Sequence, residues 1–146
     1  MEGRVNKGMT IEDTISLIRA KYEENMTKKW ISAREKPSYT WYFDRMLPGD
    51  DCGAWHSSDL WYWFGTLANG WRPWAEKDHQ LSQQMVDYLM NFVKTGNPNG
   101  EGLPQWKRAC GKCKHVLRLG EGKIRMGKAS MAKLIYTLLT NKAVGE

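Results

Sequence analysis

Cysteine is scarce in this sequence and long apolar runs are absent. The 146 residues include three cysteines, a number too small and too odd for a disulfide scaffold, so a reducing, cytoplasmic environment is expected. The longest run of apolar or small residues, 60–67, is far shorter than the roughly 20 residues of a membrane-spanning helix. The first residues also lack the apolar core of a secretory signal. We therefore expect a cytoplasmic protein that does not cross a membrane.

The composition fits one soluble globular domain with an uneven charge. Hydrophobic residues make up 41% and charged residues 26% of the chain, whose net charge is +6. Residues 107–146 contain ten basic and two acidic side chains, whereas the first 106 residues contain twelve basic and fourteen acidic ones. A basic region of this kind binds nucleic acid in some proteins. The spacing of its lysines and arginines is equally typical of the solvated side of short strands and turns.

Three helices are predicted from apolar spacing and from their end signals. The first spans 10–34, and its apolar side chains recur at steps of three and four, at Ile11, Ile15, Ile18, Tyr22 and Met26. The second spans 76–94 and ends at Gly96-Asn97-Pro98. The third spans 130–142, with Ser130 as its expected N-cap.

Few strands are visible between these helices. The segments 39–43 and 116–119 have strand character. Two strands are marginal in water unless further elements complete the sheet, so the sequence predicts an α/β domain that is only partly present. We divide it into an N-terminal helical segment (1–37), a central region of strand, loop and helix (38–107) and a basic C-terminal strand and helix (108–146).

A zinc site is one alternative for the cysteines. Cys110, Cys113 and His115 form a set of three candidate ligands, and zinc would need a fourth. Cys52 or His79 would supply it if the fold brought either of them close. A single Cys-x-x-Cys pair is a weak indicator of zinc, so this interaction module, like a nucleic-acid-binding one, stays an alternative hypothesis.

One ordered set of motifs resembles a known family. Residues 53–65 read Gly-Ala-Trp-His-Ser-Ser-Asp-Leu-Trp-Tyr-Trp-Phe-Gly, preceded by Tyr-Thr-Trp-Tyr-Phe-Asp-Arg at 39–45 and followed by Thr-Gly-Asn-Pro-Asn-Gly at 95–100. Over about residues 38–107 the sequence resembles the type-B carboxylesterases, which include para-nitrobenzyl esterases and cholinesterases. The resemblance implies the C-terminal portion of an α/β-hydrolase fold, with a few strands and about three helices.

The resemblance also implies roles for individual residues. His56 would be the general base of a Ser–His–acid triad, and Asp59, one helical turn further on, would help to anchor its loop. Ser57 and Ser58 are expected to cap the following helix rather than to act as nucleophiles. No cofactor or metal is implied. Aromatic side chains near His56 are candidates for a substrate pocket, with core packing as the alternative: Trp55, Trp61 and Trp63.

The triad nucleophile is not recognisable in these 146 residues. A nucleophile elbow requires Gly-x-Ser-x-Gly, and none of the seven serines has a glycine two residues before it. The glycine-rich oxyanion loop is missing too. We therefore expect a catalytically incomplete carboxylic ester hydrolase, inactive alone. Its expected partner is an N-terminal esterase segment that carries the serine, with self-association through exposed aromatic side chains as the other expectation.

Overall fold

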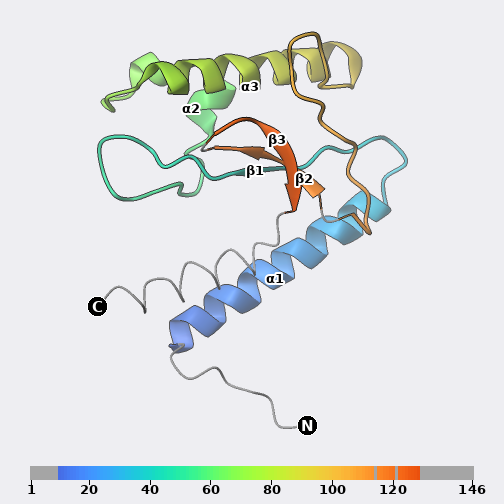
Figure 1. Ribbon diagram of the computed structural model, residues 1–146. Coiled ribbons are helices and arrows are strands. Elements are labelled where there is room, and N and C mark those ends of the chain that lie inside the picture. The colour runs from blue at the N-terminus through green and yellow to red at the C-terminus, as the bar shows by residue number, and fades with distance from the viewer. Residues whose placement is uncertain (1–9, 114, 121, 129–146) are drawn as a thin grey trace. The chain divides into compact units, whose positions relative to one another are not determined.

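The computed structural model describes residues 10–113, 115–120 and 122–128 (Figure 1). The chain divides into two compact units, which are described separately below. The first comprises residues 1–38, 110–114 and 128–146, and the second comprises residues 39–109 and 115–127. The helix predicted over 130–142 lies outside the described residues.

The first unit contains α1, Ile11–Ser32, which confirms the predicted N-terminal helix. Two lysines pair with Glu24 along this helix, with Nζ–carboxylate distances of 3.1 Å for Lys21 and 2.5 Å for Lys28. Pairs at these spacings support a helix by a few tenths of a kcal/mol each, about 0.2–0.5. Burial raises the pKa of Glu24, but the hydrogen bond from Lys28 is the larger effect and holds that pKa below its usual value.

The apolar stripe predicted along α1 is largely exposed where the structure describes its side chains. Ile18 and Tyr22 are 63% and 65% exposed, whereas Ala20, on another side of the helix, is 4% exposed. Helical spacing shows which residues share a face. It does not show whether another surface covers that face.

The first unit also contains a disulfide between Cys110 and Cys113, whose Cα atoms are 5.0 Å apart. The cysteine count does not predict this bond, because a bridge between residues i and i+3 forms locally within a turn. As a disulfide, the pair has no thiolate to offer to zinc. Cys52 is a free, exposed cysteine.

The second unit is built on a three-stranded sheet with the order β1-β2-β3. The strands are β1 (Trp41–Phe43), β2 (His115–Leu119) and β3 (Arg125–Lys128). β1 and β2 are parallel, with Trp41 opposite Leu117 and Phe43 opposite Leu119. The connection between β2 and β3 is too short for a parallel crossover, so the sheet is mixed.

β3 was not predicted from the sequence. Its residues, Arg-Met-Gly-Lys, show no apolar alternation and include a glycine, which weakens strand propensity. The strand exists because β2 offers an edge beside it. The other two strands were predicted correctly, within two residues at each end.

Two helices and a short 3₁₀ turn complete the second unit: α2 (Leu60–Trp63), η1 (Leu67–Asn69) and α3 (Glu76–Thr95). Figure 1 shows α2 and α3 on the same side of the sheet. α3 confirms the predicted second helix. It ends where Gly96 adopts a left-handed conformation (φ 73°) and its N–H donates to the Phe92 carbonyl, which is the usual way a glycine ends a helix.

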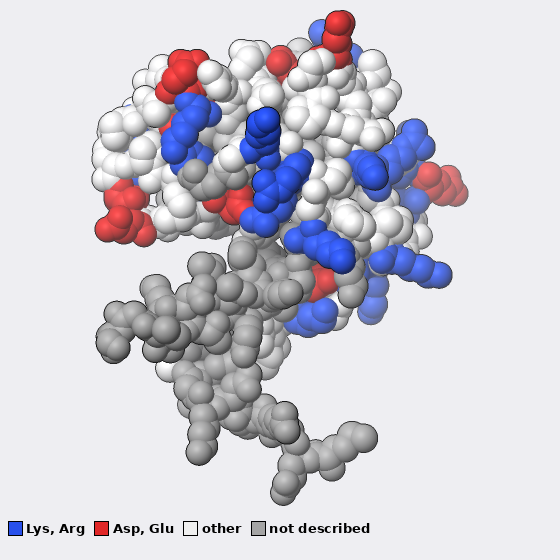
Figure 2. Space-filling model, viewed as in Figure 1, with Lys and Arg blue, Asp and Glu red and all other residues white. Residues whose placement is uncertain are grey.

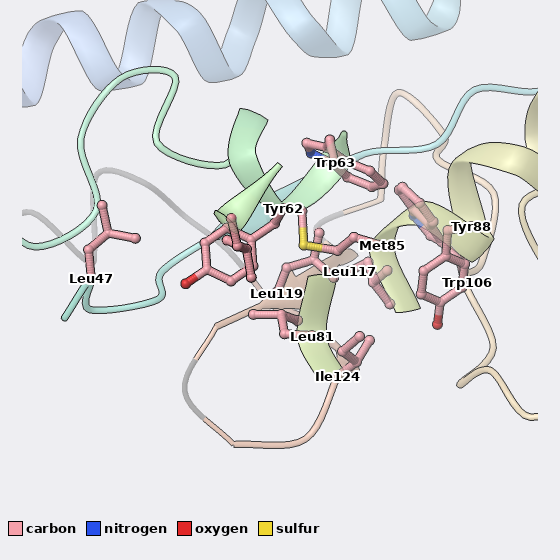
Figure 3. Close-up of a cluster of buried hydrophobic side chains, with 11 residues drawn as sticks. Leu47, Tyr62, Trp63, Leu81, Met85, Tyr88, Trp106, Leu117, Leu119 and Ile124 are labelled. Carbon is pink, nitrogen blue, oxygen red and sulfur yellow. The ribbon is translucent and has the colours of Figure 1, made fainter. Parts of the chain in front are cut away.

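The core lies between these helices and the sheet (Figure 3). Met85 and Leu117, both fully buried, lie in its middle, with Leu47 at one end and Tyr88 and Trp106 at the other. The other members are Tyr62, Trp63, Leu67, Leu81, Leu119 and Ile124. Because residues alternate along a strand, Trp41, Phe43, Leu117 and Leu119 face the helices, whereas Tyr42 and Arg118 face the other way.

A buried carboxylate joins three parts of this unit. The Asp78 side chain, at the start of α3, accepts hydrogen bonds from Arg45 Nε (2.8 Å) and Nη2 (3.2 Å), from the Tyr62 hydroxyl (2.7 Å) and from the Ala75 N–H (3.0 Å). Burial raises the pKa of Asp78, but these donors outweigh it and hold the pKa below its usual value. Burial and the same contact raise the pKa of Tyr62.

None of the helices in the described ranges combines the length and the apolar composition of a membrane span.

The disulfide predicts the pattern of thiol reactivity. In the native, unreduced protein, iodoacetamide is expected to modify Cys52 alone, because only its thiol is free and exposed. After unfolding and reduction, all three cysteines become reactive. Mass spectrometry of the intact protein measures both states. A Cys52→Ser variant is expected to take up no label before reduction, and two further labels on the unreduced protein would contradict the bridge.

The Asp78 contacts predict a pH-dependent stability. Because the folded-state pKa of Asp78 is depressed, its stabilisation is present above the unfolded-state pKa of about 3.9 and disappears as the pH falls through the folded-state value. Asp78→Asn is expected to lower the free energy of unfolding by about 3 kcal/mol or more at pH 7, since it leaves Arg45 buried without its counter-ion. Urea unfolding at pH 7 and at pH 3 measures the difference between variant and wild type, which shrinks at the lower pH.

Glu76→Gln is the matched control, because it neutralises an exposed acid in the same helical turn. It removes only a helix-dipole interaction of about 0.3–1 kcal/mol. Equal losses in the two variants at pH 7 would contradict the role assigned to Asp78.

Candidate active site

His56 lies in an exposed turn between β1 and α2. Two backbone hydrogen bonds shape this turn, from the Ser58 N–H to the Trp55 carbonyl and from the Leu60 N–H to the Ser57 carbonyl, both 3.1 Å long. Ser57 has a φ of 69°, a left-handed conformation that costs a non-glycine residue about 1–2 kcal/mol. The turn therefore holds the residue next to His56 in a strained conformation, which is common at functional sites.

Asp59 fixes the end of this turn against the sheet and the core. Its Oδ2 accepts hydrogen bonds from two indole N–H groups, those of Trp41 in β1 and Trp63 in α2, each 3.2 Å long. It is also the N-cap residue of α2, although its side chain makes no capping bond. The carboxylate thus holds β1 and α2 together, three residues after His56.

Ser57 and Ser58 do not cap α2, contrary to the prediction from the sequence. The N-cap is Asp59, so both serines precede it. The left-handed backbone at Ser57 turns the chain before the helix begins, which leaves neither hydroxyl over the free N–H groups of the first turn. Ser58 is fully buried and its Oγ has no hydrogen-bond partner.

Two ion pairs hold the loop that carries His56. The Arg45–Asp78–Tyr62 contacts join its beginning to its end. Farther along the loop, Arg72 donates to the Pro48 carbonyl (2.8 Å) and to the Asp50 carboxylate (2.7 Å). The hydrogen bond from Arg72 lowers the pKa of Asp50. His56 is therefore exposed, but the chain on both sides of it is tethered.

The three candidate pocket tryptophans occupy different environments. Trp63 is buried in the core, Trp61 is half-buried and Trp55 is 44% exposed. Trp55 packs edge-on against Trp61, which in turn packs against Trp74. Of the three, Trp63 also lines a cavity of about 320 Å³. We call this cavity the aromatic groove; its walls include Trp41, Leu60, Trp63, Phe64, Phe92 and Trp106.

The other predicted ligands and catalytic groups remain apart. His79 and His115 are exposed, on α3 and β2. Within the described ranges, no three His, Cys, Asp or Glu side chains come together as a metal site. In the same part of the chain, the His56 imidazole makes no hydrogen bond to a carboxylate or a hydroxyl. The candidate site thus consists of an exposed histidine on a tethered turn, without a hydrogen-bond partner in the described part of the chain.

The basic region offers little for the nucleic-acid hypothesis in the part that the structure describes. Arg118 pairs with Asp44 and lies over the Tyr42 ring, 5.8 Å from its centroid. On the face seen in Figure 2, lysines and arginines lie among uncharged residues, with acidic side chains next to several of them. Residues 129–146 lie outside the described part.

The comparisons with known proteins identify the family. The model of the carboxylesterase family matches residues 9–135. The chain belongs to the carboxylesterase family. This carboxylesterase-family chain is 42% identical to human cocaine esterase over 52 residues, which are 35% of the chain and 9% of that enzyme. It is 36% identical to bovine carboxylesterase 4A over 77 residues, 49% of the chain and 14% of the relative.

Two solved structures share its fold. A para-nitrobenzyl esterase matches with a TM-score of 0.57 and 22% identity, covering 68% of the carboxylesterase-family chain and 21% of the esterase. The second is an esterase of Clostridium hathewayi, described as hydrolysing aliphatic aromatic polyesters. It matches with a TM-score of 0.59 and 20% identity, and the match covers 95% of this chain and 35% of the Clostridium hathewayi esterase. These matches confirm the expected partial α/β-hydrolase fold. The chain spans well under half the length of each relative.

The contacts of Asp59 predict a specific spectroscopic change. Asp59→Ala removes the acceptor for both indole N–H groups, so the indole resonances of Trp41 and Trp63 are expected to shift, and the free energy of unfolding to fall by about 1–2 kcal/mol. Heteronuclear NMR measures this, with Trp41→Phe and Trp63→Phe assigning the resonances. Asp59→Asn, which keeps one amide oxygen as an acceptor, is expected to lie between wild type and Asp59→Ala. Unchanged indole resonances in Asp59→Ala would contradict the anchoring role.

Proposed function

We propose that this chain contributes the general base, His56, to the hydrolysis of carboxylic esters by a Ser–His–acid triad. The observation that supports the proposal best is the position of His56. It lies within the family match, in an exposed turn whose two ends are tied to the core, and its imidazole has no partner within the described part of the chain. An imidazole without a partner, on a turn with fixed ends, can serve as the base for a serine that lies in another part of the enzyme.

The reaction assigns two proton transfers to His56. The imidazole takes the proton from the serine hydroxyl as its oxygen attacks the ester carbonyl. It then gives that proton to the leaving alcohol as the carbonyl–alkoxy bond breaks, which forms the acyl-serine. Water attacks the acyl-serine in the same way and restores the serine. The imidazole is thus protonated after the first transfer and neutral again after the second.

Asp59 acts in this proposal as a positioning residue. Its carboxylate is occupied by the indoles of Trp41 and Trp63, which leaves it poorly placed to orient the imidazole itself. Its effect on catalysis is therefore indirect, through the position of the turn. The triad acid comes from elsewhere in the enzyme.

The remaining groups come from the rest of a carboxylesterase domain. Because the 146 residues contain no Gly-x-Ser-x-Gly, the proposal assigns the nucleophile, and with it the acid and the oxyanion donors, to polypeptide outside them. The substrate is a carboxylic ester. Its acyl and alcohol groups are selected by that remainder, because the walls around the serine are part of it.

A chimera tests this function without requiring two pieces to find each other. The chain replaces the matching part, 35%, of the Clostridium hathewayi esterase, and hydrolysis of a short para-nitrophenyl ester is measured. The chimera is expected to hydrolyse the ester and His56→Ala to reduce the rate to background, because removing the histidine of such a triad lowers kcat by about 10⁶-fold. The 146-residue chain alone is expected to hydrolyse no ester and to take up no serine-directed phosphonate probe.

His79→Ala provides the matched control, since His79 is also an exposed histidine but lies on α3. It is expected to leave the rate unchanged. A chimera that keeps its activity without His56, or a phosphonate adduct on the isolated chain, would overturn the proposal.

A further inference from the structure

The aromatic groove presents apolar surface that the second unit leaves uncovered. It lies between the beginning of β1, α2 and the C-terminal half of α3, and four of its side chains are substantially exposed: Trp41 (46%), Leu60 (47%), Phe64 (65%) and Phe92 (42%). Exposed apolar residues gathered in one concave place indicate an interaction site, whereas single ones are ordinary.

The polar groups of the groove already have partners. The indoles of Trp41 and Trp63 donate to Asp59, the Trp106 indole donates to the Thr40 carbonyl (3.1 Å), and the Tyr88 hydroxyl donates to the Pro104 carbonyl (2.5 Å). Burial raises the pKa of Tyr88 to about 12, so its hydroxyl stays protonated. The groove therefore offers contact surface and no vacant hydrogen bonds, which fits packed side chains of a protein core better than a polar ligand.

β1, which contributes Trp41 to the groove, is also at the edge of the sheet. In the described ranges, β1 pairs with β2 alone, so it is an edge strand whose other side has no neighbour. Parallel strands are normally buried, with further strands and helices around them, and an open edge readily pairs with another segment. An apolar groove and an open parallel strand together resemble the exposed inner surface of a larger α/β domain.

The length of the structural neighbours also indicates that a larger part of an α/β domain covers this surface. The chain accounts for 21% of the para-nitrobenzyl esterase and 35% of the Clostridium hathewayi esterase, so the matched region in each is embedded in a much larger fold. A second copy of this chain suits the surface less well. A two-fold dimer would pair β1 with itself in antiparallel fashion, over a strand of three residues.

We infer that the aromatic groove and the open edge of β1 form the docking surface for the serine-bearing remainder of a carboxylesterase domain. This inference rests on the proposed function and names the partner of the same site. Docking there places the partner beside Asp59, and hence beside the turn of His56. The energy of the contact comes from burying the rim of the groove, Phe64 and Phe92 above all.

The experiment uses two separately encoded pieces. The full 146-residue chain is produced together with an affinity-tagged Clostridium hathewayi esterase that lacks its matching 35%, and the amount of chain retained with the tagged piece is measured. Wild-type chain is expected to be retained. Phe92→Asp places a charge in the apolar contact and is expected to lower retention by about tenfold or more.

Met90→Asp is the matched control. Met90 lies on the same helix and is 45% exposed, close to the 42% of Phe92, but it does not line the groove. Its retention is expected to equal that of wild type. Phe64→Asp, at the residue that follows α2, is a second groove variant. Circular dichroism melting verifies that all variants are folded before retention is compared.

The outcomes separate this inference from the proposed function. Equal retention of Phe92→Asp, Phe64→Asp and Met90→Asp, absence of retention for wild type, or light scattering that shows a groove-dependent dimer of the chain would each overturn the docking surface. If the groove variants are retained less than wild type but the His56→Ala chimera hydrolyses the ester at an unchanged rate, the docking surface is supported and the role of His56 is overturned. His56→Ala is expected to be retained like wild type.

Discussion

The second unit depends on one buried carboxylate. Asp78 accepts four hydrogen bonds and lies at the start of α3. Its donors come from the loop directly after β1, from α2 and from the residue before α3, so one group fixes the relative positions of three elements. The arrangement is costly to disturb, because removing either charge leaves the other buried and unpaired. It also replaces the missing side-chain cap at Ala75, where the Asp78 carboxylate binds the free backbone N–H.

The consequence for the candidate site is an exposed turn with fixed ends. Arg45 precedes the loop of His56 and Tyr62 follows it, and both bind Asp78. Arg72 ties the middle of the loop through Asp50, and Asp59 ties its last residues through two indoles. None of these contacts uses the His56 imidazole. The contacts that position the turn are therefore separate from the histidine side chain, which stays exposed.

How much the sequence predicts depends on whether a feature is local. The helices at 11–32 and 76–95 and the strands at 41–43 and 115–119 have clear spacing and end signals, and they were predicted correctly. The strand at Arg125–Lys128 is defined by its neighbour and has no pattern of its own. His56 and Asp59 are candidates through the resemblance alone. The partners of Asp59 lie 18 residues before and 4 residues after it, a pairing that no local rule contains. Asp78 looked like an ordinary acid in the first turn of a helix.

The exposed apolar surfaces show the same difference between a local sequence pattern and the surroundings of the folded chain. A helix or strand pattern specifies a face, and burial of that face requires something to cover it. On α3 the pattern and the core agree, since Leu81, Met85 and Tyr88 are buried. On β1 the pattern and the core differ. Trp41 donates a hydrogen bond to Asp59 and packs against the rings of Trp63 and Trp106, but almost half of its surface is still exposed. In the docking proposal, such a side chain belongs to a core whose opposite wall is supplied by the serine-bearing remainder of the domain.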